Sequence, residues 1–226
     1  MATIDSEWLA LVLQTGDPLF PTGAYAHSLG LEEVVRLGLV CDEKSLRQFL
    51  VNQVLPALQN FELPLVRFVH EAAIRNNLDE ICGIDADMDA WKIARELREA
   101  SSQMGSRRLQ MLLKVASTPL LQNFAQRDSR NHHLVVFGIQ MAGVPLDAAL
   151  TAYLYQSLAA FCSASLKLIR IGQDGCQRVL AGCLGSVSAV VSESKTVSRE
   201  ECGWFNPLLE IASMRHEFAF ERLFIS

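Results

Sequence analysis

The spacing of apolar residues is the feature of this sequence that most constrains its fold. Leu46, Phe49 and Leu50 are three or four positions apart, and Val54 and Ala57 continue the series, which places all five on one face of a helix. The same spacing recurs in three further stretches, at 63–73, 88–101 and 109–116. Alternating runs of β-branched residues, which are typical of strands, are nearly absent. The sequence therefore predicts an all-α fold with roughly eight to ten helices.

Residues that begin and end helices support this interpretation. Gly38 follows an apolar run and can end a helix, whereas Asp42 can accept hydrogen bonds at the start of the next one. Pro119 and Pro145 occupy positions that are typical of a first helical residue. We expect the Asp-rich stretch 83–89 to be a loop between two helices.

Two more helix ends and two ambiguous stretches complete the expected pattern. Gly172 is expected to end the long apolar run 146–171. The stretches 134–137 and 187–191 contain short β-branched runs, but the helical pattern around 134–137 favours a helix there.

The composition is slightly too apolar and too lightly charged for an isolated protein of this size. Of 226 residues, 50% are hydrophobic and 20% are charged, whereas about 25% charged residues are usual. This balance excludes intrinsic disorder and indicates a surface that a partner covers. Because no repeat or long linker interrupts the pattern, we expect residues 1–226 to form a single compact multi-helix domain.

Charge and cysteine usage exclude several classes of protein. The net charge of −5 argues against nucleic-acid binding. The most apolar stretch, 148–171, contains Lys167 and Arg170, so a membrane span is not expected. The six cysteines form no CxxC pair, and residues 1–5 do not begin a signal peptide. A reduced, cytoplasmic protein is therefore expected.

A search for catalytic and metal-binding motifs finds little. No phosphate-binding loop or zinc-protease motif occurs, and the SxxK match at 192–195 lacks its companion motifs. Asp85, Asp87 and Asp89 alternate as in a calcium loop, but the required Gly and Glu are missing, so helix capping explains these acids better. The histidines do not converge on a shared metal site. We therefore expect no catalytic residue and no metal ligand.

Two segments are unusual for a plain helical protein. The first, 17–32, combines two prolines and two glycines with aromatic and polar residues. This combination predicts a rigid turn that displays Tyr25, His27 and Glu32. The second is the tail, defined as 214–226, whose last nine residues include three Phe, one Leu and one Ile. Burying each of these five is worth about 1.5–3 kcal/mol. The tail is therefore expected to dock on its own core or on another chain.

Read together, these segments resemble the urease accessory protein UreF family. The turn matches the family pattern at Asp17, Pro21, Gly23, Tyr25, His27, Ser28, Gly30, Leu31 and Glu32. A second block, 167–178, reads KLIRIGQDGCQR and resembles the family's RLIxLGQxxxQR. The last five residues, RLFIS, resemble the family's ending RLFxS. The three blocks occur in the expected order along the whole chain.

The resemblance implies an all-helical, non-enzymatic protein that is a homodimer in its working complex. It implies binding to a second accessory protein, called UreD or UreH, and through it to apo-urease. The pair would recruit the GTPase UreG and couple GTP hydrolysis to nickel insertion. No stably bound cofactor is implied, because nickel is handled by the assembled complex.

The resemblance also suggests roles for individual residues. The UreD/UreH-type partner is expected to contact tail residues Phe218, Phe220, Arg222, Leu223, Phe224 and Ser226. The GTPase-facing or dimer surface is expected to include Pro21, Gly23, Tyr25, His27, Ser28, Glu32, Lys167, Gln173 and Gln177. For Gln173 and Gln177, a local structural role is an alternative to a role in partner binding. Two alternatives also stay open: a helical metal-dependent hydrolase using His27, Glu32 and His133, and a generic helical adaptor.

Overall fold

The computed structural model describes residues 6–226. Within this range all regular structure is helical, without strands. Three of the thirteen α-helical segments run on as one helix, so the described residues form 11 helices. The predicted all-α fold is confirmed, with slightly more helices than expected. Residues 1–5, where no signal peptide was expected, lie outside the described range.

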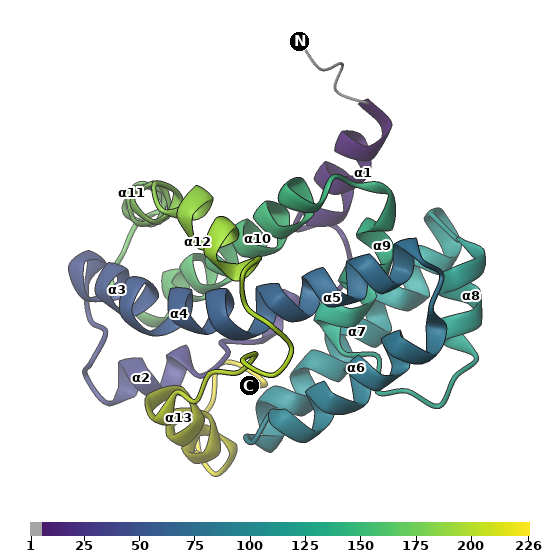
Figure 1. The fold of residues 1–226 in the computed structure, drawn as a ribbon. Helices are drawn as coiled ribbons and strands as arrows, with labels where there is room; N and C mark the ends of the chain where they lie inside the picture. The colour runs from purple at the N-terminus through teal and green to yellow at the C-terminus, as the bar shows by residue number, and fades with distance from the viewer. Residues whose placement is uncertain (1–5) are drawn as a thin grey trace.

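The elements follow one another with short connections (Figure 1). In chain order they are α1 Ser6–Gly16, η1 Ala24–Ala26, α2 Leu31–Arg36, α3 Glu43–Phe49, η2 Leu50–Val54, α4 Leu55–Ala57, η3 Leu58–Glu62, α5 Leu63–Ile74, α6 Leu78–Trp91, α7 Arg95–Val115, α8 Pro119–Ala125, α9 His133–Gln140, η4 Met141–Gly143, α10 Leu146–Leu168, α11 Gln173–Leu184, α12 Val187–Ser194 and α13 Pro207–Glu217.

The segments α3 to α5 form one continuous helix that crosses the molecule (Figure 1). Two π-helical turns, η2 and η3, interrupt it, and Pro56 and Pro64 follow them at the second residue of α4 and α5. A proline inside a helix cannot donate to the carbonyl four residues earlier. For Pro64 that carbonyl belongs to Asn60, and it accepts the N–H of Gly203 at 3.0 Å instead. The distorted helix therefore anchors the loop before α13.

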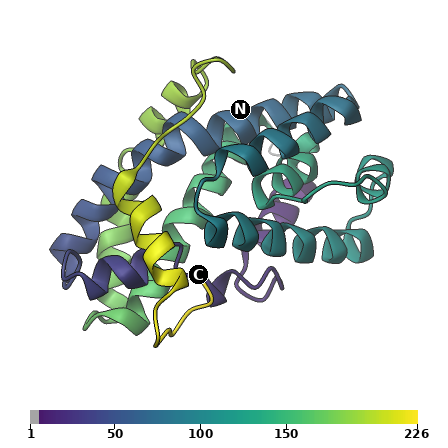
Figure 2. The same cartoon turned by 90° about the horizontal axis from the view of Figure 1, so that it is seen from below.

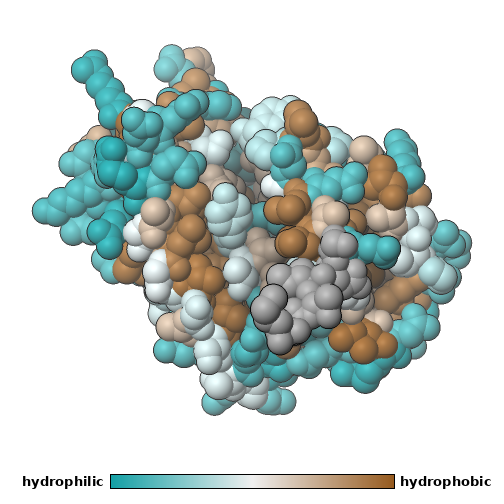
Figure 3. Space-filling view, turned by 90° about the horizontal axis from the view of Figure 1, so that it is seen from above, coloured by the Kyte–Doolittle hydropathy of each residue, from teal (hydrophilic) through white to brown (hydrophobic). Residues whose placement is uncertain are grey.

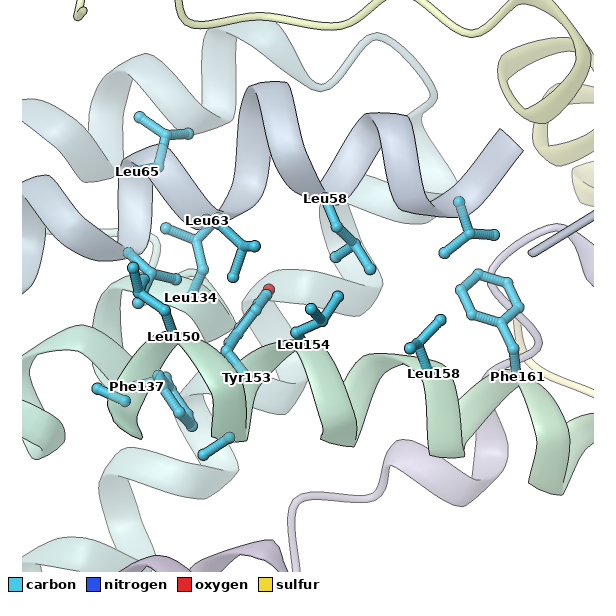
Figure 4. Close-up of a cluster of buried hydrophobic side chains, with 14 of the residues drawn as sticks. Leu58, Leu63, Leu65, Leu134, Phe137, Leu150, Tyr153, Leu154, Leu158 and Phe161 are labelled. Carbon is cyan, nitrogen blue, oxygen red and sulfur yellow. The ribbon is translucent and has the colours of Figure 1, made fainter. Parts of the chain in front are cut away.

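The core lies where α5, α9 and α10 meet. Figure 4 shows Leu63, Phe137 and Leu154 from these three helices directed toward one another, and all three are fully buried. The rings of Phe137 and Tyr153 pack edge to face with centroids 5.1 Å apart. Four residues of the predicted apolar face, Leu46, Phe49, Leu50 and Val54, belong to this core, whereas Ala57 is only half-buried.

Several predicted helix boundaries are confirmed. Gly38 has a φ of +74° and donates its N–H to Val35 O at 2.8 Å, just after the end of α2. Asp42 caps α3 by accepting the Ser45 N–H at 2.8 Å. Pro119 is the first residue of α8, whereas Pro145 immediately precedes α10. The ambiguous stretches 134–137 and 187–191 are both helical, in α9 and α12.

Three predicted boundaries are wrong. The Asp-rich stretch 83–89 lies inside α6 rather than in a loop, so these acids do not cap a helix. The helix predicted across 88–101 breaks between Trp91 and Arg95. The helix predicted to end at Gly172 ends at Leu168, and Gly172 precedes α11 instead.

Long-range contacts explain the error at 83–89. Asp85 is 1% exposed and accepts the backbone N–H groups of Arg130, Asn131 and His132 at 2.6, 3.1 and 2.8 Å. Asp89 Oδ1 lies 3.1 Å from Arg130 Nε. These partners are more than 40 residues away along the chain, so no local pattern reveals them.

The expectations about membrane spans, cysteines and the surface can be compared with the structure. No helix within 6–226 combines the length and the apolar character that crossing a membrane requires. All six cysteines are free thiols. Figure 3 shows apolar areas in brown that are separated by hydrophilic ones in teal.

Candidate functional site

Two segments that are far apart in the sequence meet on one side of the molecule. Figure 2 shows α13 beside α2, with the last residues of the chain continuing from it, and α13 and α2 are in contact. Ile225 donates its N–H to Ala26 O at 2.8 Å, and Leu29 donates to the main-chain oxygen of Ser226 at 3.2 Å. Ser28 donates to the same oxygen. The tail is thus bound to the turn 17–32 through the backbone.

A buried side-chain contact strengthens this junction. His27 Nδ1 lies 2.7 Å from Ser226 Oγ, and the two residues are only 4% and 1% exposed. Burial, and secondarily the charge of Arg107, lower the pKa of His27 to about 4. His27 is therefore neutral at pH 7, with its Nε2 buried and unpartnered among the described residues.

Two glycines allow the turn to approach its neighbours closely. Gly23 and Gly30 have φ values of +78° and +88°, which disfavour residues with a Cβ. A Cβ on Gly30 would also lie 2.8 Å from Ser213 Oγ in α13, whereas one on Gly23 would meet only the flexible end of Arg107. The turn therefore needs glycine at both positions.

Glu32 binds the tail from the first turn of α2. Its Oε1 accepts the N–H of Leu223 at 2.8 Å, and its Oε2 accepts that of Phe224 at 3.1 Å. The same Oε2 lies 2.9 Å from His216 Nε2. One carboxylate thus connects α2, α13 and the tail.

His216 lies between two carboxylates. Its Nε2 faces Glu32, and its Nδ1 lies 3.0 and 2.9 Å from the two carboxylate oxygens of Glu96 in α7. The ring can donate to both carboxylates only when it is protonated. Arg222 Nη1 lies 3.3 Å from Glu96 Oε1, so the tail also contributes a cation to this network. We call Glu32, Glu96, His216 and Arg222 the latch.

The tail is ordered on the body of the chain but only partly buried. Phe224 is 5% exposed, and its ring centroid lies 5.0 Å from Lys167 Nζ at the end of α10. By contrast, Phe218, Phe220, Leu223 and Ile225 are 83%, 102%, 70% and 54% exposed. The body of the chain therefore covers one of the tail's five large apolar side chains.

The exposed aromatic rings border an open groove, which we call the tail groove. Its apolar lining comes from Ile211 and Met214 in α13 together with Phe218 and Phe220. Arg36, Arg215, Ala219 and Glu221 complete its lining, and its volume is about 660 Å³. Arg36 and Arg215 pair with the buried Glu33 beneath.

Comparison with known proteins decides the family. A family model described as UreF matches residues 40–184. The chain belongs to the UreF family. The urease accessory protein UreF of Arthrobacter sp. (strain FB24) is 33% identical over the full length of both chains. That of Paenarthrobacter aurescens (strain TC1) is 32% identical over 94% of this chain and 96% of its own. That of Nostoc sp. (strain PCC 7120 / SAG 25.82 / UTEX 2576) is 30% identical over 95% and 94%.

The three blocks that resemble UreF converge only in part. The turn and the tail are in direct contact, and Lys167 from the second block reaches Phe224. Gln173 and Gln177 lie instead on the exposed side of α11. Their functional roles in this UreF-family chain remain predictions.

In the described part of the chain, no hydrogen bond or ion pair joins the residues of the alternative hydrolase site, although His27 and His133 both line one cleft. Glu32 bonds to His216 and the tail, and His27 bonds to Ser226. His133 packs beside Tyr153, with ring centroids 6.2 Å apart. None of the contacts described for these three residues joins one to another. Within residues 6–226 there is also no group of three or more His, Cys, Asp or Glu that could hold a metal ion.

The sequence did not identify half of the latch. Neither Glu96 nor His216 stands out locally, since each lies within an ordinary helical pattern. Their contacts span 120 and 184 residues of sequence. Pairing of this kind can be found only when the fold is known.

Proposed function

We propose that this UreF-family chain is a non-enzymatic scaffold and checkpoint for urease maturation in the cytoplasm. With a UreD/UreH-type accessory protein it would recruit a UreG-type GTPase to apo-urease and couple GTP hydrolysis to nickel insertion. It would act as a homodimer within this complex, which handles the nickel without a cofactor stably bound to this chain. Family membership and the name of its relatives support the proposal.

The observation that carries the proposal is the exposed aromatic tail on a fixed backbone. Phe218 and Phe220 are almost fully exposed, although the residues that flank them are held by Glu32, Glu96 and the turn. A contiguous exposed apolar patch marks an interaction site. Because the segment is already ordered, a partner that binds it needs to restrict fewer degrees of freedom. We therefore assign the tail groove to the UreD/UreH-type partner.

The GTPase-facing or dimer surface is assigned to exposed residues of the turn and the second block. Tyr25 is 76% exposed, and Lys167, Gln173 and Gln177 are exposed as well. His27 and Glu32 face inward, toward the tail. We propose that these two act on the partners through the position of the tail.

Co-purification with a UreD/UreH-type protein tests this function. A chain that lacks residues 217–226 should lose the partner while remaining helical by circular dichroism. The deletion also removes the buried Phe224 and Ser226, so the double substitution Phe218→Ser with Phe220→Ser is the cleaner variant. Phe205→Ser is the matched control, because Phe205 is 65% exposed and lies outside the tail.

The outcomes separate the proposal from its alternatives. The proposal requires that the double variant lose the partner and fail to support urease activation, while Phe205→Ser retains both. Normal recovery of the partner by the double variant would contradict it. A metal ion held tightly and stoichiometrically by the isolated chain would instead favour the metal-dependent hydrolase.

A further inference from the structure

A large cleft on the described part of the chain contains no latch or tail-groove residue, although the turn 17–32, Lys167 and Phe224 border it. Its volume is about 840 Å³, which is within the range of small-molecule sites. Partly exposed aromatic side chains border it, among them Trp91, Trp204 and Phe205. Its buried lining includes Arg108 of α7 and Tyr153 of α10. Figure 4 shows the Tyr153 hydroxyl directed from α10 toward the α4–α5 run.

Arg108 is a buried cation without a counter-ion. Its residue is 1% exposed, and the described part of the chain provides no carboxylate in an ion pair with it. Its Nε donates to Gln140 Oε1 at 2.7 Å, and its Nη2 donates to Thr15 O at 3.5 Å. A guanidinium has five N–H donors, so three of them have no acceptor in residues 6–226. Isolated buried charges are costly, and they are normally paired.

Two aromatic rings offset part of the cost of burying the charge of Arg108. The guanidinium carbon of Arg108 lies 4.9 Å from the Phe137 ring centroid and 5.5 Å from that of Phe20. Burial lowers the pKa of Arg108 to about 9, so the group stays charged at pH 7. These contacts stabilise the cation without using its remaining N–H groups.

A second cation and a neutral histidine lie near Arg108 in this part of the cleft. Burial, and then the charges of Arg108 and Lys92, lower the pKa of His133 to about 3. Both cations therefore act on His133, whose Nδ1 is buried and has no partner among the described residues. Glu62 is occupied, because its Oε1 lies 3.2 Å from Lys92 Nζ and its Oε2 accepts the Tyr153 hydroxyl at 2.9 Å.

The other acids of the cleft are also engaged. Glu210 accepts the Ala94 N–H at 2.9 Å, and Asp17 accepts the Leu19 N–H at 2.8 Å. Neither of them bonds to Arg108. These acids keep their charge, and together with Glu62 they equal in number the cations of the lining, Arg108, Lys92 and Lys167. The buried end of the cleft is therefore distinguished by the unused N–H donors of Arg108.

We propose that this cleft binds a small organic acid, with its carboxylate on Arg108 and its apolar part against the aromatic rim. The planar fork of a guanidinium matches a carboxylate through two parallel hydrogen bonds. The rim supplies the apolar surface that such a ligand needs, and the unpaired charge of Arg108 disfavours a cationic ligand. The proposal concerns the isolated chain and does not depend on the partners proposed above.

Three ligands with the same six-carbon chain and different head groups test this proposal on the full-length protein. Hexanoate, hexanol and hexylammonium are titrated at constant ionic strength by isothermal titration calorimetry. We expect hexanoate to bind saturably with one site and at least tenfold more tightly than hexanol, with hexylammonium weakest. Absence of saturable hexanoate binding, or equal affinity for hexanoate and hexanol, would overturn the proposal.

A charge-removing pair of variants locates the site. Arg108→Gln should weaken hexanoate binding at least tenfold and leave hexanol binding nearly unchanged. Lys114→Gln removes a charge from an exposed position of the same helix and should leave both affinities unchanged. Undiminished hexanoate binding by Arg108→Gln would refute the assignment to Arg108. If that variant does not fold, the comparison of the three probes on the wild type still decides.

Discussion

Glu32 Oε2 and His216 Nε2 lie 2.9 Å apart, and this contact connects the turn 17–32 to α13, the helix that leads into the tail. Because Glu32 also accepts the N–H groups of Leu223 and Phe224, the same carboxylate fixes both ends of the exposed aromatic segment. The latch thus converts a chain end that would otherwise be mobile into a defined surface.

Removing the charge of Glu32 should release the tail. In Glu32→Gln the hydrogen bonds to His216, Leu223 and Phe224 lose their ionised acceptor, and bonds to charged groups contribute about 1.5–3 kcal/mol. We expect amide hydrogen exchange at Leu223 and Phe224 to accelerate at least about tenfold. Glu221→Gln is the control, since Glu221 is exposed in the same tail. Unchanged protection in Glu32→Gln would show that the latch does not hold the tail.

Acid should weaken the junction between His27 and Ser226. The folded state lowers the pKa of His27 from 6.5 to about 4, so the folded chain binds this proton less readily than the unfolded chain. The stabilisation is fully present above pH 6.5 and is lost as the pH falls toward 4, by at most about 1.4 kcal/mol per pH unit. Denaturant unfolding at several pH values measures this slope.

A variant that lacks only His27 isolates this contribution. His27→Gln should have a shallower dependence of stability on pH between 6.5 and 4 than the wild type. Some slope should remain, because the pKa of His133 is also lowered, to about 3, chiefly by burial. An identical slope in both proteins would contradict the role of His27.

The packing of α7 against the segment before α9 depends on Gly105. A Cβ there would lie 1.8 Å from Asn131 O and 2.7 Å from His133 N, both of them backbone atoms. We expect Gly105→Ala to cost about 3 kcal/mol or more. Gly83→Ala is the matched control, because a Cβ on this exposed position in α6 meets nothing within 4 Å. It should stabilise the chain by about 0.5–1 kcal/mol in the same unfolding experiment.

Asp85 should be much more important for stability than its position in an Asp-rich stretch suggests. Asp85→Asn replaces an acceptor of three backbone N–H groups by an amide that must present a donor to one of them. We expect a loss of about 3 kcal/mol in the free energy of unfolding. Asp79→Asn, which removes a solvent-exposed ion pair with Arg127 and a negative charge in the first turn of α6, should change it by less than about 1 kcal/mol.

The comparison of Asp42 with Asp85 shows what the sequence can predict. Asp42 caps the helix that begins at the next residue, and the capping signal is complete within four positions. Asp85 has partners 45 to 47 residues away, so its role appears only when α6 is packed beside the segment 130–132. The all-α fold depends mainly on local periodicity, and the sequence therefore predicted it correctly.

In the candidate site, too, local features were predictable from the sequence and long-range contacts were not. The turn and the tail were recognisable from their prolines, glycines and aromatic residues. The sequence did not predict that the turn and the tail bind each other, because Glu32 and His216 are 184 positions apart. The tail was expected to dock on its own core or on another chain, and the body of the chain covers one of its five large apolar side chains, Phe224. The two that remain most exposed, Phe218 and Phe220, are those available to a partner.

The most direct test of the central claim is the equilibrium affinity of this chain for its UreD/UreH-type partner. Phe218→Ser with Phe220→Ser should weaken binding at least a hundredfold, because two exposed aromatic anchors of this kind each contribute about 2 kcal/mol or more at an interface. Phe205→Ser should bind as the wild type does. Equal affinities for the wild type and the double variant would show that the tail groove is not the docking surface.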